Sequence, residues 1–162
     1  MQPRASKTRY LVRRASLEEV LPLRWRVLRP GLPPETAAFQ GDDAQHTEHW
    51  LAQDTETGAV VSVASIYQVG LPAGQGSIVT NPSACWQLRG MASSPDSQGQ
   101  GAGGALLEGI LLSLQGRWGR PVFWCNARQR AVPFYARHGF ETTSDPFDIP
   151  GVGPHRVMQR AV

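Results

Sequence analysis

The stretch SPDSQGQGAGGALLEGILL, residues 94–112, passes from a glycine-rich segment into an apolar run and decides how the centre of the chain folds. Its glycines stand at positions 99, 101, 103, 104 and 109. Each glycine weakens a helix by roughly 1 kcal/mol relative to alanine, so local stability does not explain them. A bare backbone at a helix start lets several N–H groups converge on one anion, and the helix dipole favours the same charge. We therefore interpret residues 98–104 as an anion-binding loop.

The apolar residues that follow predict a helix between two strands. The positions that recur at the spacing of one helix face are Leu106, Leu107, Ile110, Leu111 and Leu114. The segment CWQLRGMA, residues 85–92, precedes the loop, and PVFWCNA, residues 121–127, follows the helix. Both segments are typical of strands, and the strand, helix, strand order predicts a right-handed parallel crossover.

Two other glycine motifs compete for this loop. A P-loop needs a lysine after its last glycine, but Gly104 is followed by Ala105 and Leu106. The dinucleotide pattern G-x-G-x-x-G is matched by Gly99, Gly101 and Gly104, yet the next strand ends in Cys125 and Asn126 where that pattern expects an acid. Too little sequence follows for a dinucleotide fold, so this interpretation is the weaker one.

The flanking sequence predicts further elements. Ser16 can cap a helix that starts at Leu17, with Glu18 and Glu19 in its favourable first turn. A polar loop spans residues 40–50, and Gly139 ends a helix around residues 131–138. The remaining strands are expected at residues 10–14, 50–53, 60–69, 141–147 and 155–161.

Composition fits one globular domain over residues 1–162. Hydrophobic residues make up 41% of the chain and charged residues 18%, and no apolar run reaches the roughly 20 residues that span a bilayer. The first residues lack the apolar region of a secretory signal, so a cytoplasmic protein without a membrane partner is expected. The net charge is +3, but the arginines are scattered, so no nucleic-acid partner is expected. Cys85 and Cys125 lie far apart and predict buried thiols rather than a disulfide or a metal site.

Two motifs together resemble the GNAT superfamily of N-acetyltransferases. The first is Q-x-x-G-x-G at residues 98–103, and the second is F-Y-x-x-x-G-F at residues 134–140. The resemblance is strong over residues 61–140 and covers the flanks only in element order. It implies an α/β fold with a mixed central β-sheet, splayed between the 85–92 and 121–127 strands, and helices on both faces.

The resemblance also implies that acetyl-CoA is the acyl donor. The backbone that would hold its pyrophosphate comprises Gln98, Gly99, Gln100, Gly101, Ala102, Gly103 and Gly104. Met91 and Ser93 would line the pantetheine arm, which Asn126 would touch, and Tyr135 would protonate the departing thiolate. Each has a plain structural alternative: strand packing for Met91 and Ser93, a helix cap for Asn126, and a core aromatic for Tyr135.

The base that deprotonates the amine is less evident. Many family members carry a glutamate where this chain has Gln87, which cannot act as a base. The candidates are His155 and, in the polar loop, Asp42, Asp43, His46, Glu48 and His49, each with a solvated or capping alternative. His46 and His49 alone are a weak metal signal, so no metal is expected. Arg89 shares a strand face with Gln87 and Met91, so we expect it either to bind a substrate carboxylate or to form an ordinary salt bridge.

The sequence therefore predicts an N-acetyltransferase that moves an acetyl group from acetyl-CoA directly to a primary amine. Tyr135 and His155 are the candidate catalytic residues, and Gln87, Arg89 and Asp42 are the candidate acceptor-binding residues. The alternative is a catalytically silent module that binds or senses acyl-CoA. The acceptor, a small molecule or a protein amine, stays open, and so does a homodimer.

Overall fold

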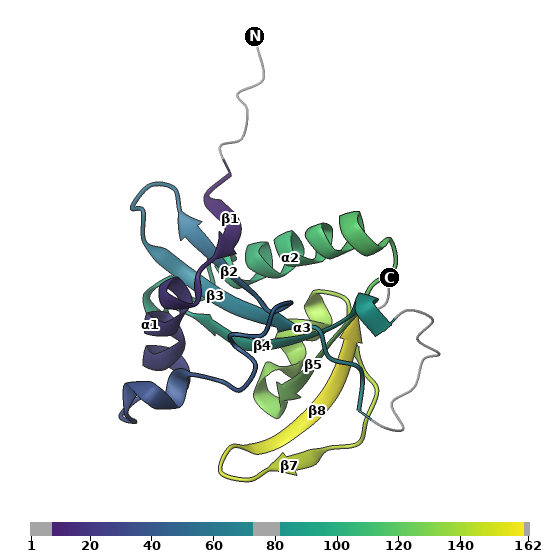
Figure 1. The fold of residues 1–162 in the computed structure, drawn as a ribbon. Coiled ribbons are helices and arrows are strands. Elements are labelled where there is room, and N and C mark those ends of the chain that lie inside the picture. Colours follow the sequence, from purple (N-terminus) through teal and green to yellow (C-terminus); the bar gives the residue numbers. More distant parts are fainter. Residues whose placement is uncertain (1–7, 73–81, 161–162) are drawn as a thin grey trace.

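The computed structural model describes residues 8–72 and 82–160, and in this part of the chain eight strands form one mixed sheet (Figure 1). The strand order is β1-β2-β3-β4-β5-β8-β6, and β7 pairs with β8. Only β4 and β5 are parallel; the other pairs are antiparallel. The strands are β1 Tyr10–Ala15, β2 Glu48–Asp54, β3 Val60–Tyr67, β4 Cys85–Ser93, β5 Val122–Arg128, β6 Phe140–Thr142, β7 Phe147–Ile149 and β8 Gly153–Arg160.

Within the described residues, three α-helices connect these strands, with short 3-10 turns between them. The helices are α1 Leu17–Leu28, α2 Ala102–Trp118 and α3 Val132–Arg137, and the 3-10 turns are η1 Pro34–Ala37, η2 Pro82–Ala84, η3 Pro95–Ser97 and η4 Gln129–Ala131. The predicted cap of α1 is present as a capping box: the Glu19 N–H donates to Ser16 Oγ, and the Ser16 N–H donates to the Glu19 carboxylate.

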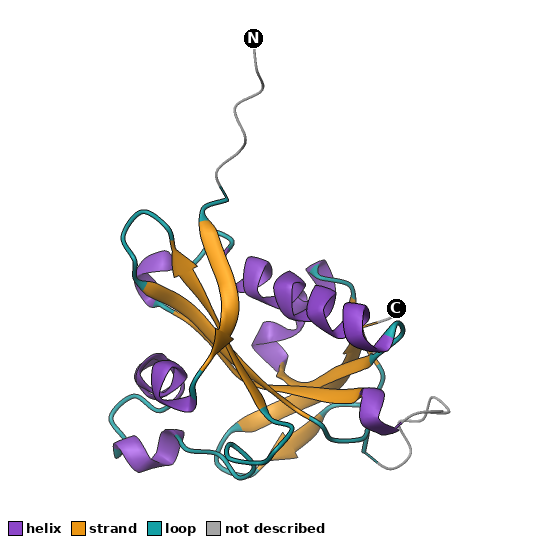
Figure 2. Cartoon of the chain, turned by 45° about the horizontal axis from the view of Figure 1, so that its top comes forward, coloured by secondary structure: helices purple, strands orange, loops and turns teal. Residues whose placement is uncertain are grey.

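The helices cover both faces of the sheet, as predicted (Figure 2). On one face, the apolar stripe of α2 packs with Tyr135 of α3 against Ile66, Leu88 and Phe123 of the sheet. On the other face, Val20 and Leu23 of α1 pack on residues of β2, β3 and β4. Every predicted stripe residue of α2 is buried.

The sheet opens where β4 and β5 diverge. Their parallel pairing runs only from Cys85↔Val122 to Leu88↔Cys125. Beyond it, β4 continues along β3 to Ser93, and β5 continues along β8 to Arg128. The two strand ends separate in the plane of the sheet, so the predicted splay is confirmed and leaves a gap at the carboxyl ends of both strands.

Several predicted bounds were wrong. Strand β2 begins at Glu48, inside the predicted polar loop, and the single strand expected over residues 141–147 is two strands, β6 and β7. Strand β4 contains a bulge: its register with β3 shifts between Val63 and Ser65, and Gly90 lies there with φ +64°. A glycine within a strand pattern is the usual signal for such a bulge.

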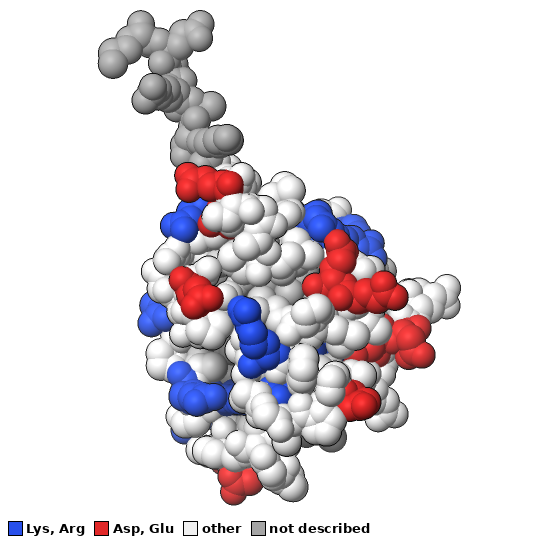
Figure 3. Space-filling model, turned by 90° about the vertical axis from the view of Figure 1, so that its left-hand side faces the viewer, with Lys and Arg blue, Asp and Glu red and all other residues white. Residues whose placement is uncertain are grey.

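The charged residues do not form one patch on the face that carries α1. Figure 3 shows basic and acidic side chains interspersed among uncharged ones there. Cys85 and Cys125 are buried and unpaired, and burial raises the pKa of the Cys125 thiol. Within residues 8–72 and 82–160, no helix is long and apolar enough to cross a membrane, and no cluster of three or more metal-ligating side chains occurs.

Candidate active site

One pocket of about 1180 Å³ fills the gap between the diverging strands. It is larger than the roughly 300–1,000 Å³ of ordinary small-molecule sites, so a long ligand and a second substrate fit together. The predicted site residues that line it are Gln87, Arg89, Met91, Ser93, Gln98, Gly99, Gly101, Ala102, Gly103, Gly104, Asn126, Tyr135 and His155. The structure thus collects residues from β4, β5, β8, α2 and α3 around one cavity.

The glycine loop presents bare backbone to this pocket. Gly101 is the N-cap of α2 in the left-handed conformation, with φ +87°, and no side chain caps the helix. A Cβ at Gly99 or Gly101 would meet no atom within 4 Å, so their side of the loop is open. The N–H groups of Ala102, Gly103 and Gly104 open α2 and have no carbonyl one turn earlier. Such a cradle fits a pyrophosphate.

The other glycines of this stretch serve packing. A Cβ at Gly104 would lie 2.6 Å from Cε1 of His138, and one at Gly109 would lie 2.6 Å from Cγ1 of Val12. A Cβ at Gly103 would lie 3.2 Å from the Ser93 hydroxyl. The glycines therefore have two roles: positions 99 and 101 shape the loop, whereas positions 103, 104 and 109 let α2 approach its neighbours.

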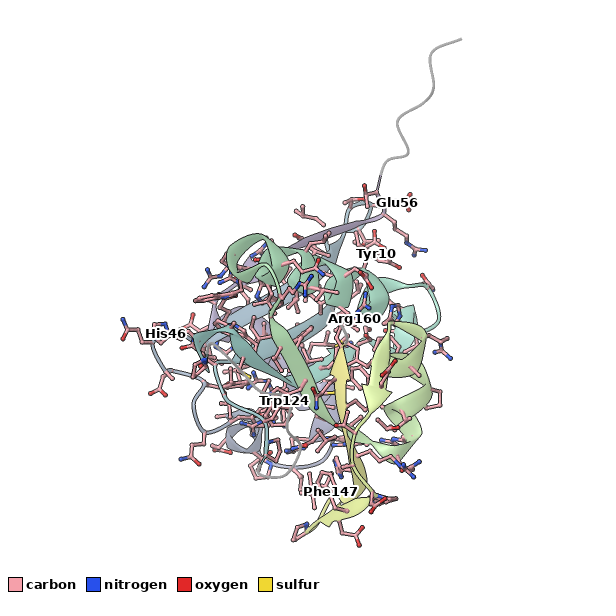
Figure 4. The ribbon with its side chains drawn as sticks, turned by 90° about the vertical axis from the view of Figure 1, so that its right-hand side faces the viewer. Tyr10, His46, Glu56, Trp124, Phe147 and Arg160 are labelled. Carbon is pink, nitrogen blue, oxygen red and sulfur yellow. The ribbon has the colours of Figure 1, made fainter. Side chains whose placement is uncertain are left out.

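Strand β1 anchors the loop through Gln100, which does not line the pocket. The Tyr10 hydroxyl donates to the Gln100 carbonyl at 2.9 Å, and the Arg9 guanidinium donates to Gln100 Oε1. Tyr10 lies near the end of the sheet that carries the N-terminal segment (Figure 4). These contacts hold the middle of the loop, and no local sequence pattern predicts them because Tyr10 and Gln100 lie 90 residues apart.

Asn126 leaves a polar atom without a partner at the pocket. Its Oδ1 is buried and accepts no hydrogen bond from the described residues. An unpaired buried acceptor costs free energy, so the atom is suited to a ligand N–H. The pantetheine arm of CoA carries amide N–H groups, and the residues present therefore fit that cofactor.

Tyr135 is almost completely buried, yet it faces the same pocket. Its ring contacts Phe134 and Phe140 with centroids 5.2 and 5.5 Å away. Burial raises the pKa of the phenol far above its ordinary value. The hydroxyl thus stays protonated at neutral pH and is available as a proton donor.

His155 is 4% exposed, and a backbone contact fixes its tautomer. Its Nδ1 lies 2.7 Å from the Gly153 carbonyl, which can only accept, so Nδ1 carries the hydrogen. In the neutral ring the lone pair is then on Nε2, the atom that a base uses. Among the candidate bases, His155 is the one that lines the pocket.

A family comparison agrees with this geometry. The sequence model described as the acetyltransferase (GNAT) domain matches residues 35–156. The chain belongs to the GNAT acetyltransferase family. The chain is also 33% identical over 152 residues to the uncharacterized N-acetyltransferase YitI of Bacillus subtilis (strain 168), and the match covers 93% of this chain and 95% of that protein.

Solved structures share the GNAT fold. Escherichia coli ElaA superposes with a TM-score of 0.68 at 18% identity, covering 93% of this chain and 97% of that one. An acyl-CoA N-acyltransferase from Pseudomonas aeruginosa superposes with a TM-score of 0.63 at 20% identity, covering 94% of this chain and 98% of that one. The GNAT fold implies use of an acyl-CoA, and the family acts on amine acceptors.

The other base candidates of this GNAT protein lie outside the pocket. Asp42, also expected at the acceptor, is instead buried in an ion pair with Arg24, with 2.8 Å between Asp42 Oδ2 and Arg24 Nη1. Burial alone would raise the pKa of Asp42, but hydrogen bonds from Arg24, Tyr67 and the Phe39 N–H together lower it. A charge held in this way is structural.

The rest of the polar loop is also occupied or remote. Glu48 is buried and pairs with Arg117 and Arg14, and its carboxylate accepts from the Trp50 indole. His49 is buried between the Ser65 hydroxyl and the Asp42 carbonyl. Asp43 and His46 are exposed, and His46 points away from the sheet at the outer edge of the molecule (Figure 4).

Further residues that no sequence motif marked also line the pocket of this GNAT protein. They include Arg29 from the end of α1, Phe39 from the loop after η1, and Arg128 from the end of β5. Phe39 directly precedes the polar loop at residues 40–50, and no motif includes it. The two arginines lie about 100 residues apart in sequence, so no local pattern could join them.

Proposed function

We propose that this protein is an N-acetyltransferase that moves the acetyl group of acetyl-CoA to a primary amine. The observation that carries the proposal is the single pocket that joins the open glycine loop to Tyr135 and His155. The loop fits a pyrophosphate, Asn126 offers an unused acceptor, and two proton-transfer groups stand beside the gap in the sheet.

The residues that would hold acetyl-CoA follow the strand ends. The N–H groups at residues 98–104 would bind the pyrophosphate, Met91 and Ser93 of β4 would line the pantetheine arm, and Asn126 would accept a hydrogen bond from it. When bound, acetyl-CoA supplies an acetyl thioester. The chain itself positions that group and handles two protons.

His155 takes the first proton. An amine must lose its proton before it can attack a carbonyl carbon, and Nε2 is the free nitrogen of a ring held through Nδ1. The Gly153 carbonyl keeps the ring in that tautomer and stabilises the imidazolium that forms. His155 thus supplies the base that many family members provide with a glutamate at the position of Gln87.

Tyr135 supplies the second proton. Burial raises the pKa of the phenol, so Tyr135 still carries its proton when the C–S bond breaks, and the thiolate that leaves into the same pocket takes that proton to become the thiol of CoA. An acid positioned in this way contributes roughly 10²–10⁴-fold to a rate.

A thiol-release assay tests the proposal. Purified protein is mixed with acetyl-CoA and a panel of amines, free CoA is measured with a thiol reagent, and the acetylated product is identified by mass spectrometry. We expect release that depends on an amine, and micromolar binding of acetyl-CoA and CoA with little binding of NAD or ATP. Binding of acetyl-CoA without turnover of any amine would favour the silent acyl-CoA-binding module, and tight NAD binding without CoA binding would contradict both.

A further inference from the structure

Three arginines converge on the acceptor end of the pocket from separate elements. Arg29 comes from the end of α1, Arg89 from the middle of β4 and Arg128 from the end of β5. All three are half-buried. Among the ion pairs of residues 8–72 and 82–160, none involves any of the three. An ordinary salt bridge therefore does not explain Arg89.

The ring of Phe39 holds two of these guanidinium groups in place. The Cζ atoms of Arg89 and Arg29 lie 5.1 and 5.4 Å from its centroid. Arg89 also lies 5.0 Å from the centroid of Tyr67, and its Nη1 donates to the Gln40 carbonyl at 3.4 Å. Stacking on aromatic rings orients a guanidinium and leaves the donors at its edge available.

The charge at this end of the pocket is uncompensated. Burial lowers the pKa of Arg128, and repulsion from Arg130 and Arg29 lowers it further. Of the lining residues that the structure describes, Glu108 alone is acidic; it lies on α2, and its Oε1 is 3.9 Å from Nδ1 of His138, the C-cap residue of α3. Like charges that face one gap without an acid are stabilised by a bound anion.

The register of β5 and β8 relates this charge to the base. Arg128 pairs directly with His155 across the two strands, so their side chains lie on the same face of the sheet. Arg89 lies on β4 before Met91 and Ser93, so the pantetheine-lining residues separate it from the glycine loop. The cluster is therefore beside the proposed base and away from the proposed pyrophosphate site.

We propose that the acceptor is a small amine that also carries a carboxylate, which Arg29, Arg89 and Arg128 bind while the amine faces His155. This inference rests on the proposed N-acetyltransferase function. A guanidinium can bind both carboxylate oxygens at once, which fixes direction as well as affinity. A polyamine or an aminoglycoside would bring further positive charge to the same end and is rejected by repulsion.

A matched pair of acceptors tests the charge alone. An ω-amino acid and its primary amide of the same chain length differ in one negative charge, and several lengths are compared, together with a polyamine. Steady-state kinetics give kcat/KM for each acceptor, and calorimetry gives the affinity of each for the CoA-saturated protein. Variants are Arg29→Ala, Arg89→Ala and Arg128→Ala, with Arg120→Ala as the control because Arg120 is exposed and does not line the pocket.

The wild-type protein is expected to prefer the acid over the amide by roughly 10-fold or more at the best length, since charge-assisted hydrogen bonds are about twice as strong as neutral ones. Arg89→Ala should raise the KM of the acid more than the KM of the amide and so reduce that preference, and added salt should reduce the preference too. Arg120→Ala should keep it.

Two failures are distinguishable. Turnover of acids, amides and polyamines with equal kcat/KM, or a preference that survives all three pocket substitutions, overturns the carboxylate inference and leaves the acetyltransferase proposal standing. An acid that binds the CoA-saturated protein through Arg89 without any turnover supports the anion site and overturns the proposed function.

Discussion

Replacing Tyr135 by phenylalanine removes one hydroxyl from the pocket and keeps the packed ring. The contacts with Phe134 and Phe140, at 5.2 and 5.5 Å between centroids, are made by carbon atoms that phenylalanine retains. The hydroxyl has no hydrogen-bond partner among the residues that the structure describes. The substitution therefore separates what the ring does from what the proton does.

The two expected effects differ in size and direction. Loss of an unpartnered hydroxyl should change the free energy of unfolding by less than about 1 kcal/mol, and toward stability. Loss of a positioned acid should lower kcat by about 100-fold, which is ~2.7 kcal/mol of transition-state stabilisation. The affinity for acetyl-CoA should stay the same, because the hydroxyl acts only as the sulfur departs.

Tyr67→Phe is the matched control. The Tyr67 hydroxyl donates to the buried Asp42 carboxylate, and burial together with that bond raises the pKa of Tyr67 to about 12. Its loss should cost about 1–3 kcal/mol of stability with much less effect on kcat. Thermal melting and steady-state thiol release on both variants give opposite patterns. Full activity in a stable Tyr135→Phe protein would remove Tyr135 from the mechanism.

The raised pKa of Tyr135 adds a pH prediction. A group whose pKa is raised keeps its proton to higher pH, so the donor form persists beyond the ordinary phenol value of about 10. Ionisation of Tyr135 should therefore not lower the kcat of the wild-type protein between pH 7 and about pH 10. Any fall in kcat over that range should be seen in Tyr135→Phe as well. A fall in kcat that the wild-type protein shows and Tyr135→Phe lacks would mean that the phenol ionises near its ordinary pKa and that the pocket does not desolvate it.

Three further substitutions test other parts of the site. Gly101→Val should abolish CoA binding in calorimetry and keep the circular dichroism spectrum, because a β-branched residue resists φ +87°; Gly116→Ala, inside α2, should bind CoA normally. His155→Gln should lower kcat by roughly 100-fold, with partial recovery at high pH where more of the amine is already deprotonated, and an unchanged rate would exclude His155 as the base. Asp42→Asn should lower the free energy of unfolding by about 3–5 kcal/mol, because Arg24 is fully buried. The lowered pKa of Asp42 means that its contribution is present above the unfolded value of about 4 and is lost as pH falls through the lower folded value, so the melting temperature of the two proteins should converge in acid.

Local patterns predicted the parts of the fold that local physics decides. The apolar stripe of α2 and the helix cap at Ser16 each depend on residues within a few positions of one another. The splay of β4 and β5 followed from the family resemblance, and the short pairing from Cys85 to Leu88 bears it out.

Partners from distant segments could not be predicted in the same way. Asp42 lies in a polar segment whose composition is typical of a solvated loop, and only the tertiary structure brings Arg24 to it. In the sequence, Arg29 and Arg128 look like ordinary charged residues, because only the tertiary structure brings the ends of α1 and β5 to one pocket. The roles of Met91, Ser93, Asn126, Tyr135 and His155 remain predictions, since their place around the pocket is compatible with catalysis and also with packing.

The buried ion pair between Arg24 and Asp42 positions the segment that carries Phe39 to the pocket. Arg24 has no exposed surface, and its Nε has no partner among the described residues, so a pair of apolar side chains would pack α1 on the sheet at less cost. The ion pair instead fixes the position of the segment from Ala37 to Phe39. Arg24 donates to the Ala37 carbonyl, Asp42 accepts the Phe39 N–H, and the Arg24 guanidinium lies 4.4 Å from the Phe39 centroid.

The same guanidinium also constrains β4. A Cβ at Gly90 would lie 2.9 Å from Arg24 Nε, and the glycine has φ +64°, so the bulge in β4 stands where Arg24 passes beneath it. Arg89 is the residue next to that bulge, and Phe39 is the ring on which Arg29 and Arg89 lie. One buried side chain thus positions both the strand that carries Arg89 and the ring on which Arg89 lies, so the packing of α1 on the sheet supports the proposed carboxylate site.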